Sequence, residues 1–192
     1  FDIEKKYSKI DEIPFDFKRK RMSVVIQNRR GEQVLICKGA IEEVLSLCGS
    51  YETKEGTEPF AGGMTDRISG MVTDLSRQGF RVLALGYRIF RDGKGSYSVS
   101  DESGLTLLGF LAFLDPPKET SAEAIDKFHK YNVNVKVLTG DNEIVTKKIC
   151  RDVNIPVDRI LLGSDIDGMS DEQLRREAEE TSVFARLSPV HK

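Results

Sequence analysis

The sequence is poor in the residues that build metal clusters, disulfide frameworks and the common nucleophilic sites. It contains three cysteines, Cys37, Cys48 and Cys150, and two histidines among its 192 residues. The cysteine spacing fits no metal cluster, and an odd number fits no disulfide framework. Two of the cysteines fall in apolar patterns, which predicts buried free thiols in a reducing compartment. Neither a Ser/His/Asp nor a Cys/His arrangement emerges, so we assign no metal ligands.

Long hydrophobic runs and a dominant charge are also lacking. The longest apolar run, from Leu105 to Leu114, contains Thr106 and Gly109 and has about half the residues needed to span a bilayer. The first residues are charged and polar, unlike a signal peptide. A formal net charge of -2 gives no global attraction to nucleic acid or to an anionic membrane. We therefore expect a soluble chain with no nucleic-acid partner.

The first half carries the patterns of an antiparallel α+β unit. Residues 22–39 read as two strands joined by a turn around Asn28 and Gly31, whereas the opening segment is polar up to Ile10. The remaining pattern predicts a helix over 40–47 ended by Gly49, a loop over 56–63, a helix over 66–78, strands over 80–90 and 105–113, and a loop over 92–103.

The character of the sequence changes at Asp115, which two prolines follow. Proline cannot donate to a strand ladder, so the preceding strand ends there. The pattern then predicts helices over 121–130, 142–152 and 171–180, alternating with strands over 133–138, 159–162 and 182–185. This alternation is typical of a parallel sheet built from βαβ units. We place a domain boundary near Asp115, with one domain over 1–114 and a second over 115–192.

Lys38 and Gly39 follow an apolar strand and precede a helix. Lysine is costly to bury, so one interpretation is that Lys38 marks the surface end of the strand. The other is that Lys38 faces a ligand, with Gly39 allowing the ligand to approach the backbone. The residues alone leave the two interpretations equal.

A second candidate site lies at Thr139-Gly140-Asp141, between a predicted strand and a predicted helix. Ligands of open α/β sheets bind at the carboxyl ends of strands, and a helix N-terminus offers free N–H groups to an anion. Thr139 can donate to a phosphoryl oxygen, Gly140 permits a tight turn, and Asp141 can orient a lysine or a metal-bound water. The alternative is that Asp141 or Asn142 caps the helix.

Three further places carry charged or aromatic residues. Phe15 and Phe17 lie among four basic residues over 18–21; they predict either base stacking with phosphate contacts or a solvated edge strand. Arg81 begins an apolar strand and can bind a phosphate or carboxylate, or serve as a strand-end surface charge. Lys192 can neutralise a phosphoryl group or be an ordinary terminal lysine. His129 has no ligand-spaced partner and is predicted at the surface.

Six motifs occur together and in order: PFDFKRKRMSV, CKGA, GFRVLAL, FLDPPKET, VLTGDN and FARLSPVHK. This ordered set covers essentially the whole chain and resembles the P-type ion-transporting ATPases. The longer segments EIPFDFKRKRMSVV, AFLDPPKET and LLGSDID are most similar to the bacterial magnesium-transporting subgroup. Single motifs such as KGA or TGD are short, but the series at these separations is highly specific.

The resemblance implies an ATP site in the first domain. The aromatic residue matching Phe15 stacks on adenine, and the residues matching Lys20 and Met22 lie in the same pocket. The lysine matching Lys38 lines the adenosine site, and Gly39 lets the base come close. The arginine matching Arg81 contacts the phosphates, and Leu83 lies beside the base.

The resemblance also implies that Asp115 begins the hinge into part of an α/β, haloacid-dehalogenase-like phosphorylation domain of Rossmann type. There, Thr139, Gly140 and Asp141 would hold the phosphoryl and metal region, and Lys192 would neutralise the phosphoryl group. The family's DKTGT, GDGxND and TGE motifs and its transmembrane helices are absent from this sequence. We therefore expect a fragment whose nucleotide-binding domain lacks its N-terminal part.

These expectations combine into one function. The parent would use ATP and Mg²⁺, form an aspartyl-phosphate and transport magnesium across the bacterial inner membrane, with this chain as a cytoplasmic part. The fragment would bind ATP without turnover and would have the remainder of the parent chain as partner. The alternatives are a haloacid-dehalogenase-like phosphatase, for which no DxD occurs at the end of an early strand, and a non-catalytic nucleotide-sensing module. We also expect the strand over 133–138 to lack a neighbour along one edge.

Overall fold

The structure, a computed structural model, describes residues 6–60 and 62–191. The chain divides into two compact units. The first unit runs up to Ile68 and continues over Val82–Ala112, and the second contains Ser69–Arg81 and the residues from Phe113 onward. The last change from the first unit to the second lies between Ala112 and Phe113, close to Asp115, where the sequence places its boundary. The sequence did not predict that residues 69–81 belong to the second unit, since it assigns them to the first domain.

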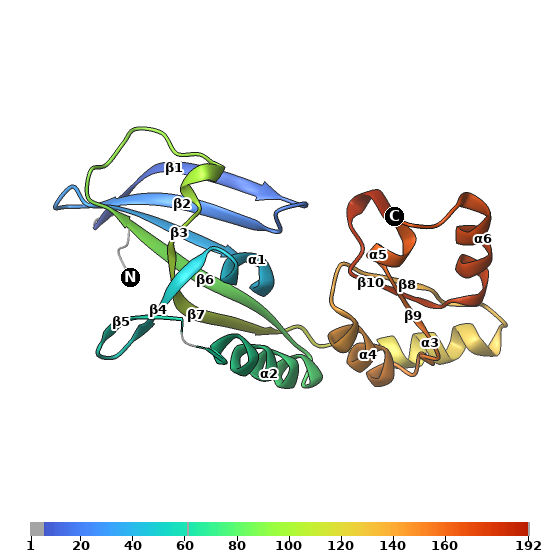
Figure 1. Cartoon of the computed structure of the whole chain (residues 1–192). Helices are drawn as coiled ribbons and strands as arrows, with labels where there is room; N and C mark the ends of the chain where they lie inside the picture. The colour runs from blue at the N-terminus through green and yellow to red at the C-terminus, as the bar shows by residue number, and fades with distance from the viewer. Residues whose placement is uncertain (1–5, 61, 192) are drawn as a thin grey trace. The chain divides into compact units, whose positions relative to one another are not determined.

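Within the described residues, a seven-stranded sheet has the order β1-β2-β3-β6-β7-β4-β5 (Figure 1). The pairs β1–β2, β2–β3, β3–β6 and β4–β5 are antiparallel, and β4–β7 is parallel. A mostly antiparallel α+β unit is therefore confirmed. Its strands are β1 (Tyr7–Asp16), β2 (Arg21–Asn28), β3 (Gln33–Gly39), β4 (Cys48–Thr53), β5 (Gly56–Pro59), β6 (Phe80–Phe90) and β7 (Leu105–Leu114).

Side chains on one face of the central strands form the core of the first unit. Val25, Leu35 and Leu105, at odd positions of β2, β3 and β7, are fully buried; successive side chains of a strand point to opposite faces, and these three point to the core. Burying one such side chain contributes about 1.5–3 kcal/mol. The helix α1 (Ile41–Leu45) adds Val44, which is also fully buried. The predicted hairpin over 22–39 is confirmed, with its turn closed by Asn28 and by Gly31 at φ 82°.

Two parts of this sheet differ from the sequence prediction. The opening segment is a strand, β1, although it is mostly exposed and therefore shows no clean alternation. The segment around Gly56, expected as a loop, forms the hairpin of β4 and β5, and Gly49 lies in β4 instead of ending a helix. All four residues of β5 are exposed, so no hydrophobic periodicity indicated a strand there.

The second unit holds a parallel sheet of three strands in the part that the structure describes, ordered β8-β10-β9. The predicted βαβ alternation is confirmed, although β8 spans only Val137–Leu138, less than the expected 133–138. The strands are β8 (Val137–Leu138), β9 (Ile160–Leu162) and β10 (Val183–Ala185); the helices are α2 (Met64–Arg77), which begins in the first unit, α3 (Ser121–Lys130), α4 (Glu143–Asp152), α5 (Gly163–Ile166) and α6 (Asp171–Glu180).

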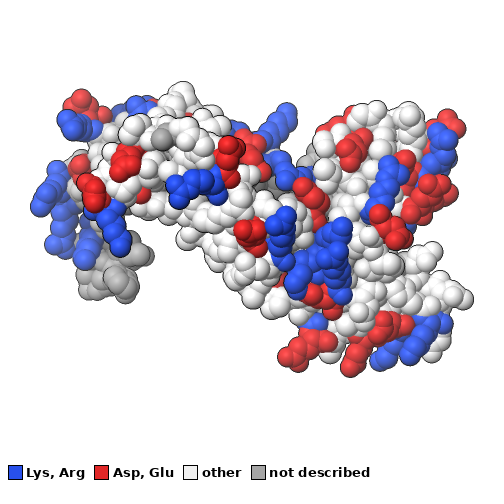
Figure 2. Space-filling model, turned by 60° about the horizontal axis from the view of Figure 1, so that its bottom comes forward, with Lys and Arg blue, Asp and Glu red and all other residues white. Residues whose placement is uncertain are grey.

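Buried apolar residues lie on both sides of β10. One cluster joins Cys150, Val153, Ile155 and Val183, and another joins Leu161, Phe184 and Leu187. Short 3₁₀ turns are η1 (Val99–Asp101) in the first unit and η2 (Pro189–His191) in the second. On the face in Figure 2, lysine and arginine side chains lie among aspartates and glutamates. Across residues 6–60 and 62–191, no helix combines the length and the apolar character needed to cross a bilayer.

Candidate functional site

One face of the first unit's sheet brings together most of the predicted nucleotide residues. Met22 on β2 pairs with Lys38 on β3, and Lys38 pairs with Leu85 on β6. Directly paired residues share a sheet face, and so do residues two apart on one strand. Leu83 therefore lies on the same face as Lys38. The face thus presents three partly buried apolar side chains, Met22, Leu83 and Leu85, beside an exposed lysine.

Lys38 is exposed, and among the described residues no carboxylate pairs with its side chain. The same holds for Lys20 in the turn between β1 and β2, whereas the charge of Lys18, in the same turn, helps to lower the pKa of Asp16. An unpaired cation keeps its full capacity to bind an anion. Lys38, at the end of β3, and Lys20, in the adjoining turn, therefore favour an anionic ligand at this end of the sheet.

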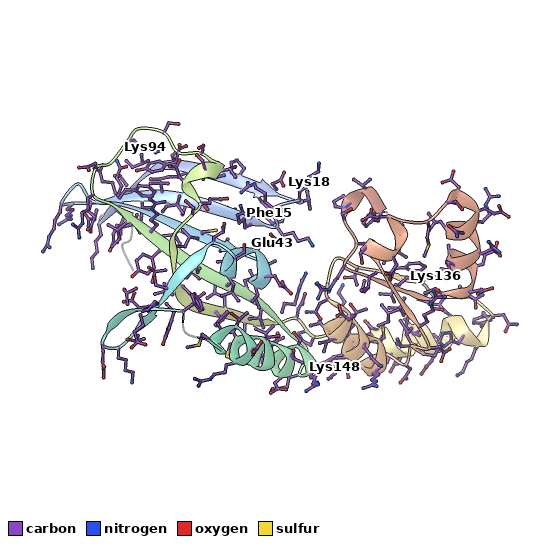
Figure 3. All side chains as sticks on the ribbon, viewed as in Figure 1. Phe15, Lys18, Glu43, Lys94, Lys136 and Lys148 are labelled. Carbon is purple, nitrogen blue, oxygen red and sulfur yellow. The ribbon has the colours of Figure 1, made fainter. Side chains whose placement is uncertain are left out.

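The aromatic residues lie at the same end of the sheet. Figure 3 shows Phe15 and Lys18 where β1 turns toward β2, at the end that also carries α1 with Glu43. Phe15 is 50% exposed, and its ring meets the ring of Phe17 edge to face, with centroids 5.2 Å apart. An edge-to-face contact fixes the ring while leaving a π-face open. Phe15 therefore has the exposure that base stacking requires.

Asp16 builds the turn that carries the basic residues. Its Oδ1 accepts hydrogen bonds from the amides of Lys18 (2.9 Å) and Arg19 (2.8 Å), and its carbonyl accepts from the amide of Lys20 (2.7 Å). The bond from the Arg19 amide is the main reason why the pKa of Asp16 lies below its usual value. Lys20 is held at φ 47°, a conformation uncommon for a residue other than glycine.

The turn is joined directly to the Lys38-Gly39-Ala40 segment. The carbonyl of Lys20 accepts a hydrogen bond from the amide of Ala40 (2.9 Å). A Cβ at Gly39 would lie 2.5 Å from the Cβ of Arg21 and 2.6 Å from the Lys20 carbonyl oxygen. Glycine is thus required at position 39 by the approach of the neighbouring strand. Its predicted role in letting a base approach stays a prediction.

The basic run divides into two kinds of residue. Arg19 and Arg21 form ion pairs with Glu102, at 2.7 and 2.8 Å, so they are neither solvated surface charges nor free for phosphate. Lys18 and Lys20 are exposed. Glu102 itself was not identified from the sequence, because an acidic residue in a polar loop carries no local signal of burial.

The second candidate site, in the second unit, is a turn that follows β8. The Thr139 hydroxyl donates to Asp141 Oδ2 (3.0 Å) and accepts from the Asp141 amide (3.1 Å). Asn142, and not Asp141, caps α4, since its side chain accepts from the amide of Val145 (2.9 Å). Asp141 is therefore available for another partner, and it binds Arg81, with Nη2 2.5 Å from Oδ1.

Backbone contacts fix this turn against the segment after β10. Leu187 donates its amide to the Thr139 carbonyl (3.0 Å), and Arg186 donates to the Asp141 carbonyl (2.8 Å). A Cβ at Gly140 would lie 3.3 Å from the Leu187 carbonyl oxygen, so a side chain there would crowd the contact. The structure thus brings Thr139, Asp141 and Arg81 together.

For three other residues that the sequence analysis singled out, the structure shows no binding site. Asp115 is exposed in the segment between β7 and α3. Lys192 lies outside the described residues. His129 is exposed on α3, as predicted. Within the described residues, no group of three or more His, Cys, Asp or Glu side chains is placed to hold a metal ion.

A small cavity of about 110 Å³ lies beside the Thr139 turn. Nucleotide-sized ligands occupy pockets of roughly 300–1,000 Å³, so this cavity is not a nucleotide site. Its lining is mostly apolar and consists of Val137, Thr139, Asp141, Thr146, Ile149, Cys150, Val153 and Ile155.

All three cysteines are free, as predicted. Cys37 and Cys150 are buried, and Cys48 is partly buried. Burial disfavours the thiolate, and it raises the pKa of Cys37 and Cys150 and brings the pKa of Cys48 to about 11. The thiols are therefore poor nucleophiles.

Comparisons with known proteins agree with the motif series. Magnesium-transporting ATPase, P-type 1, of Escherichia coli (strain K12) is 42% identical over 190 residues, which are 99% of this chain and 21% of that protein. The protein of the same name from Salmonella typhimurium (strain 14028s / SGSC 2262) is 43% identical over 187 residues, 97% of this chain and 21% of its own.

A calcium-transporting ATPase also resembles the chain. Calcium-transporting ATPase 1 of Lactococcus lactis subsp. lactis (strain IL1403) is 28% identical over 193 residues, 100% of this chain and 22% of that protein. The chain thus spans about a fifth of the length of these relatives. The family model described as "P-type ATPase, cytoplasmic domain N" matches residues 2–120, more than half of the chain. The chain therefore belongs to the P-type ATPase family.

Proposed function

We propose that the first unit binds ATP and that the chain is the nucleotide-binding part of a magnesium-transporting P-type ATPase. The observation that carries this proposal is the sheet face on which Lys38, without a carboxylate partner among the described residues, lies beside Met22 and Leu83. Apolar side chains with a few placed cations are what an adenine nucleotide needs from a site. The names of the relatives supply the transported ion.

The adenine end of the site would be apolar. Phe15, half exposed, would stack on the base, and Met22 and Leu83 would contact it. Lys38 and Lys20 would line the adenosine part, with Gly39 allowing close approach. Base–aromatic stacking is worth about 1–3 kcal/mol, so Phe15 is expected to be the main apolar contributor.

The phosphate end would involve Arg81, the second residue of β6. A guanidinium forms paired hydrogen bonds with phosphate oxygens. In this structure Arg81 binds Asp141, an anion that a phosphate would replace. We infer that nucleotide binding exchanges one anionic partner of Arg81 for another.

The second unit would be part of a haloacid-dehalogenase-like phosphorylation domain of Rossmann type, starting at Asp115. Its parallel sheet and the Thr139-Gly140-Asp141 turn at the carboxyl end of β8 support this proposal. Thr139 and Asp141 would hold the phosphoryl and metal region, and Lys192 would neutralise the phosphoryl group. Mg²⁺ is usually held by one or two carboxylates together with phosphates and waters, so Asp141 would suit an ion that arrives with ATP.

In the parent protein, ATP would supply a γ-phosphoryl group to an aspartate. Phosphoryl transfer of this kind depends on positioning and charge neutralisation, which are the roles proposed for Arg81, Thr139 and Lys192. The phosphorylated-aspartate motif DKTGT does not occur in this sequence, so the 192-residue chain would bind ATP without hydrolysing it. The parent would be a bacterial inner-membrane transporter, with this chain on the cytoplasmic side.

Titration calorimetry with ATP tests the proposal. Phe15→Ala should weaken binding by about 1–3 kcal/mol, and Lys38→Met should also weaken it while leaving the unliganded thermal midpoint nearly unchanged. Matched controls are Phe128→Ala, a phenylalanine of similar exposure at 47%, and Lys54→Met, an exposed lysine of the β4–β5 turn. Equal effects from the site variants and their controls would refute the proposed site.

A further inference from the structure

Glu102 is a fully buried carboxylate in the first unit. The residue is 1% exposed, and it accepts hydrogen bonds from Arg19 Nη1 (2.7 Å), Arg21 Nε (2.8 Å) and Ser23 Oγ (2.7 Å). A buried charge is tolerated only when it is paired and hydrogen-bonded. Both oxygens of Glu102 meet this requirement, since Ser23 bonds Oε1 and the two arginines bond Oε2.

The three donors occupy alternate positions in the chain. Arg21 and Ser23 are two residues apart on β2 and share a sheet face, and both are buried. The residue between them, Met22, must then point to the opposite face, together with Lys38. Glu102 therefore binds the inward side of the segment whose outward side forms the proposed ATP site.

Glu102 is itself held rigidly in its loop. It follows η1, whose Ser98 and Asp101 hydrogen-bond to each other's backbone, and its amide donates to the Val99 carbonyl (3.2 Å). Leu105, three residues further on, is fully buried at the start of β7. The backbone that carries the Glu102 carboxylate is therefore held in a fixed position.

Lys20 connects this network to the Lys38 segment. Its neighbours Arg19 and Arg21 are both bound to Glu102, while Lys20 keeps a φ of 47° and its carbonyl accepts from Ala40. Backbone held in such a sparsely populated region persists only when its surroundings fix it. The two arginine contacts supply that constraint on both sides.

We propose that Glu102 is a positioning residue for the ATP site: by binding Arg19, Arg21 and Ser23 it fixes the β1–β2 turn and so places Lys20 and Met22 toward the nucleotide. This inference rests on the proposed ATP-binding function. Well-packed apolar residues often stabilise a core as well as a buried ion pair does. Fixing one geometry of the turn is therefore the role that sets this network apart.

The experiment compares Glu102→Gln with Tyr97→Phe in the 192-residue chain. Gln keeps the shape but removes the charge that two guanidiniums share. Tyr97 lies in the same loop, is 7% exposed and donates to buried Gln33, so its variant removes a buried hydrogen bond that does not touch the turn. We expect Glu102→Gln to raise the Kd for ATP on the order of tenfold and Tyr97→Phe to leave it unchanged.

A double-mutant cycle with Lys20→Ala separates positioning from general stability. If Glu102 acts through Lys20, Glu102→Gln should raise the Kd much less in the Lys20→Ala background, because coupled residues are not additive. Equal factors in both backgrounds would overturn the proposal. Should Glu102→Gln fail to fold, Glu102→Asp takes its place, since it keeps the charge and withdraws the carboxylate by one methylene.

Amide exchange of the ligand-free protein keeps this inference separate from the proposed function. Glu102→Gln should speed exchange at the amides of Lys20 and Ala40, which donate to the Asp16 and Lys20 carbonyls, and Tyr97→Phe should not. If the unmodified chain binds no ATP, the proposed function fails and with it the role of Glu102 toward ATP, whereas faster exchange would still show that Glu102 fixes the turn. Unchanged exchange in a folded Glu102→Gln protein would overturn the inference.

Discussion

Arg81 and Asp141 form an ion pair, with Arg81 Nη2 2.5 Å from Asp141 Oδ1. The Arg81 side chain is 53% exposed and that of Asp141 is 18% exposed. Ion pairs with an exposed member contribute about 0–1 kcal/mol, so the pair competes only weakly with a phosphate for the guanidinium. Its two residues come from distant parts of the sequence, and each is a separate phosphate-site candidate in the sequence.

Removing the carboxylate should therefore free Arg81. In buffer without Mg²⁺, where Asp141 has no metal ion to hold, we expect Asp141→Ala to strengthen ATP binding by up to about fivefold, the equivalent of roughly 1 kcal/mol. Binding of adenosine, which has no phosphate, should stay unchanged. Calorimetry with both ligands measures this. The same substitution in an Arg81→Ala background should have no effect on ATP affinity. A loss of ATP affinity in Asp141→Ala would mean that Asp141 contributes to binding and does not compete with it.

The β1–β2 turn should respond to acid through Asp16. Its pKa is lowered, chiefly by the hydrogen bond from the Arg19 amide, so the ionised form is favoured in the folded protein. The stabilisation is present above the ordinary value of 3.8 and is lost as the pH falls through the lower, folded pKa. NMR shifts of the Lys18 and Arg19 amides should titrate below pH 3.8, and Asp16→Asn should abolish that titration. A midpoint above the ordinary value would contradict the proposed hydrogen bonds.

Cys48 should be slow to react with thiol reagents. Burial raises its pKa to about 11 from an ordinary 9.0, so at pH 8 about one thiol in a thousand is ionised, compared with about one in ten at pKa 9. Iodoacetamide labelling of the native chain, followed by peptide mass spectrometry, should show at least about tenfold slower modification of Cys48 than of a free peptide thiol. Rapid labelling of Cys48 in the native chain would exclude the buried environment.

Lys136 should stabilise the second unit through the end of α6. Its ammonium donates to the carbonyls of Ala178 (2.5 Å), Glu179 (3.2 Å) and Thr181 (2.9 Å), which lie where a helix leaves carbonyls without partners; Figure 3 shows its position. Because hydrogen bonds from a charged donor contribute about 1.5–3 kcal/mol, Lys136→Met should lower the free energy of unfolding by about that amount. Lys147→Met, at an exposed position of α4, is the control; equal losses would refute the capping role.

The sequence was most informative where apolar runs are bounded by turn residues. Two such runs joined by a turn around Asn28 and Gly31 predict the β2–β3 hairpin, and Asn142, a cap candidate at a predicted helix start, is the residue that caps α4. The sequence indicated an edge strand at β1 only as one of two interpretations of the segment around Phe15, and it predicted a loop in place of β5, because the residues of both strands are largely exposed on both faces. Glu102 was missed because its burial depends on arginines about 80 positions away, and no local pattern records such a contact.

Gly39 is a predicted site residue whose structural contact also could not be predicted from the sequence. The sequence identifies the position and the need for a glycine. The structure gives the physical reason as the approach of the Lys20–Arg21 backbone, which leaves no room for a Cβ. A residue can therefore be marked correctly from its pattern while the contact that requires it lies in another strand.

β8 is the place where the second unit should be least protected. It is an edge strand that pairs only with β10 among the described residues, as the sequence led us to expect. The amides of Val137 and Thr139 donate to the carbonyls of Ser182 and Phe184, at 2.8 and 3.0 Å. Amides of successive residues point to opposite sides of a strand, so the Leu138 amide faces the open edge.

Backbone amide exchange on a monomeric sample tests this arrangement. The Leu138 amide should exchange at nearly the rate of an unstructured peptide, while the Val137 and Thr139 amides are slowed by their hydrogen bonds. The reference is β3, which has β2 on one side and β6 on the other, so that every amide from Val34 to Cys37 should be protected. Protection of the Leu138 amide equal to that of the β3 amides would mean that another chain or another segment covers the edge. An open strand edge is a template for pairing between chains. If the protection fell on dilution, the covering segment would therefore belong to a second copy.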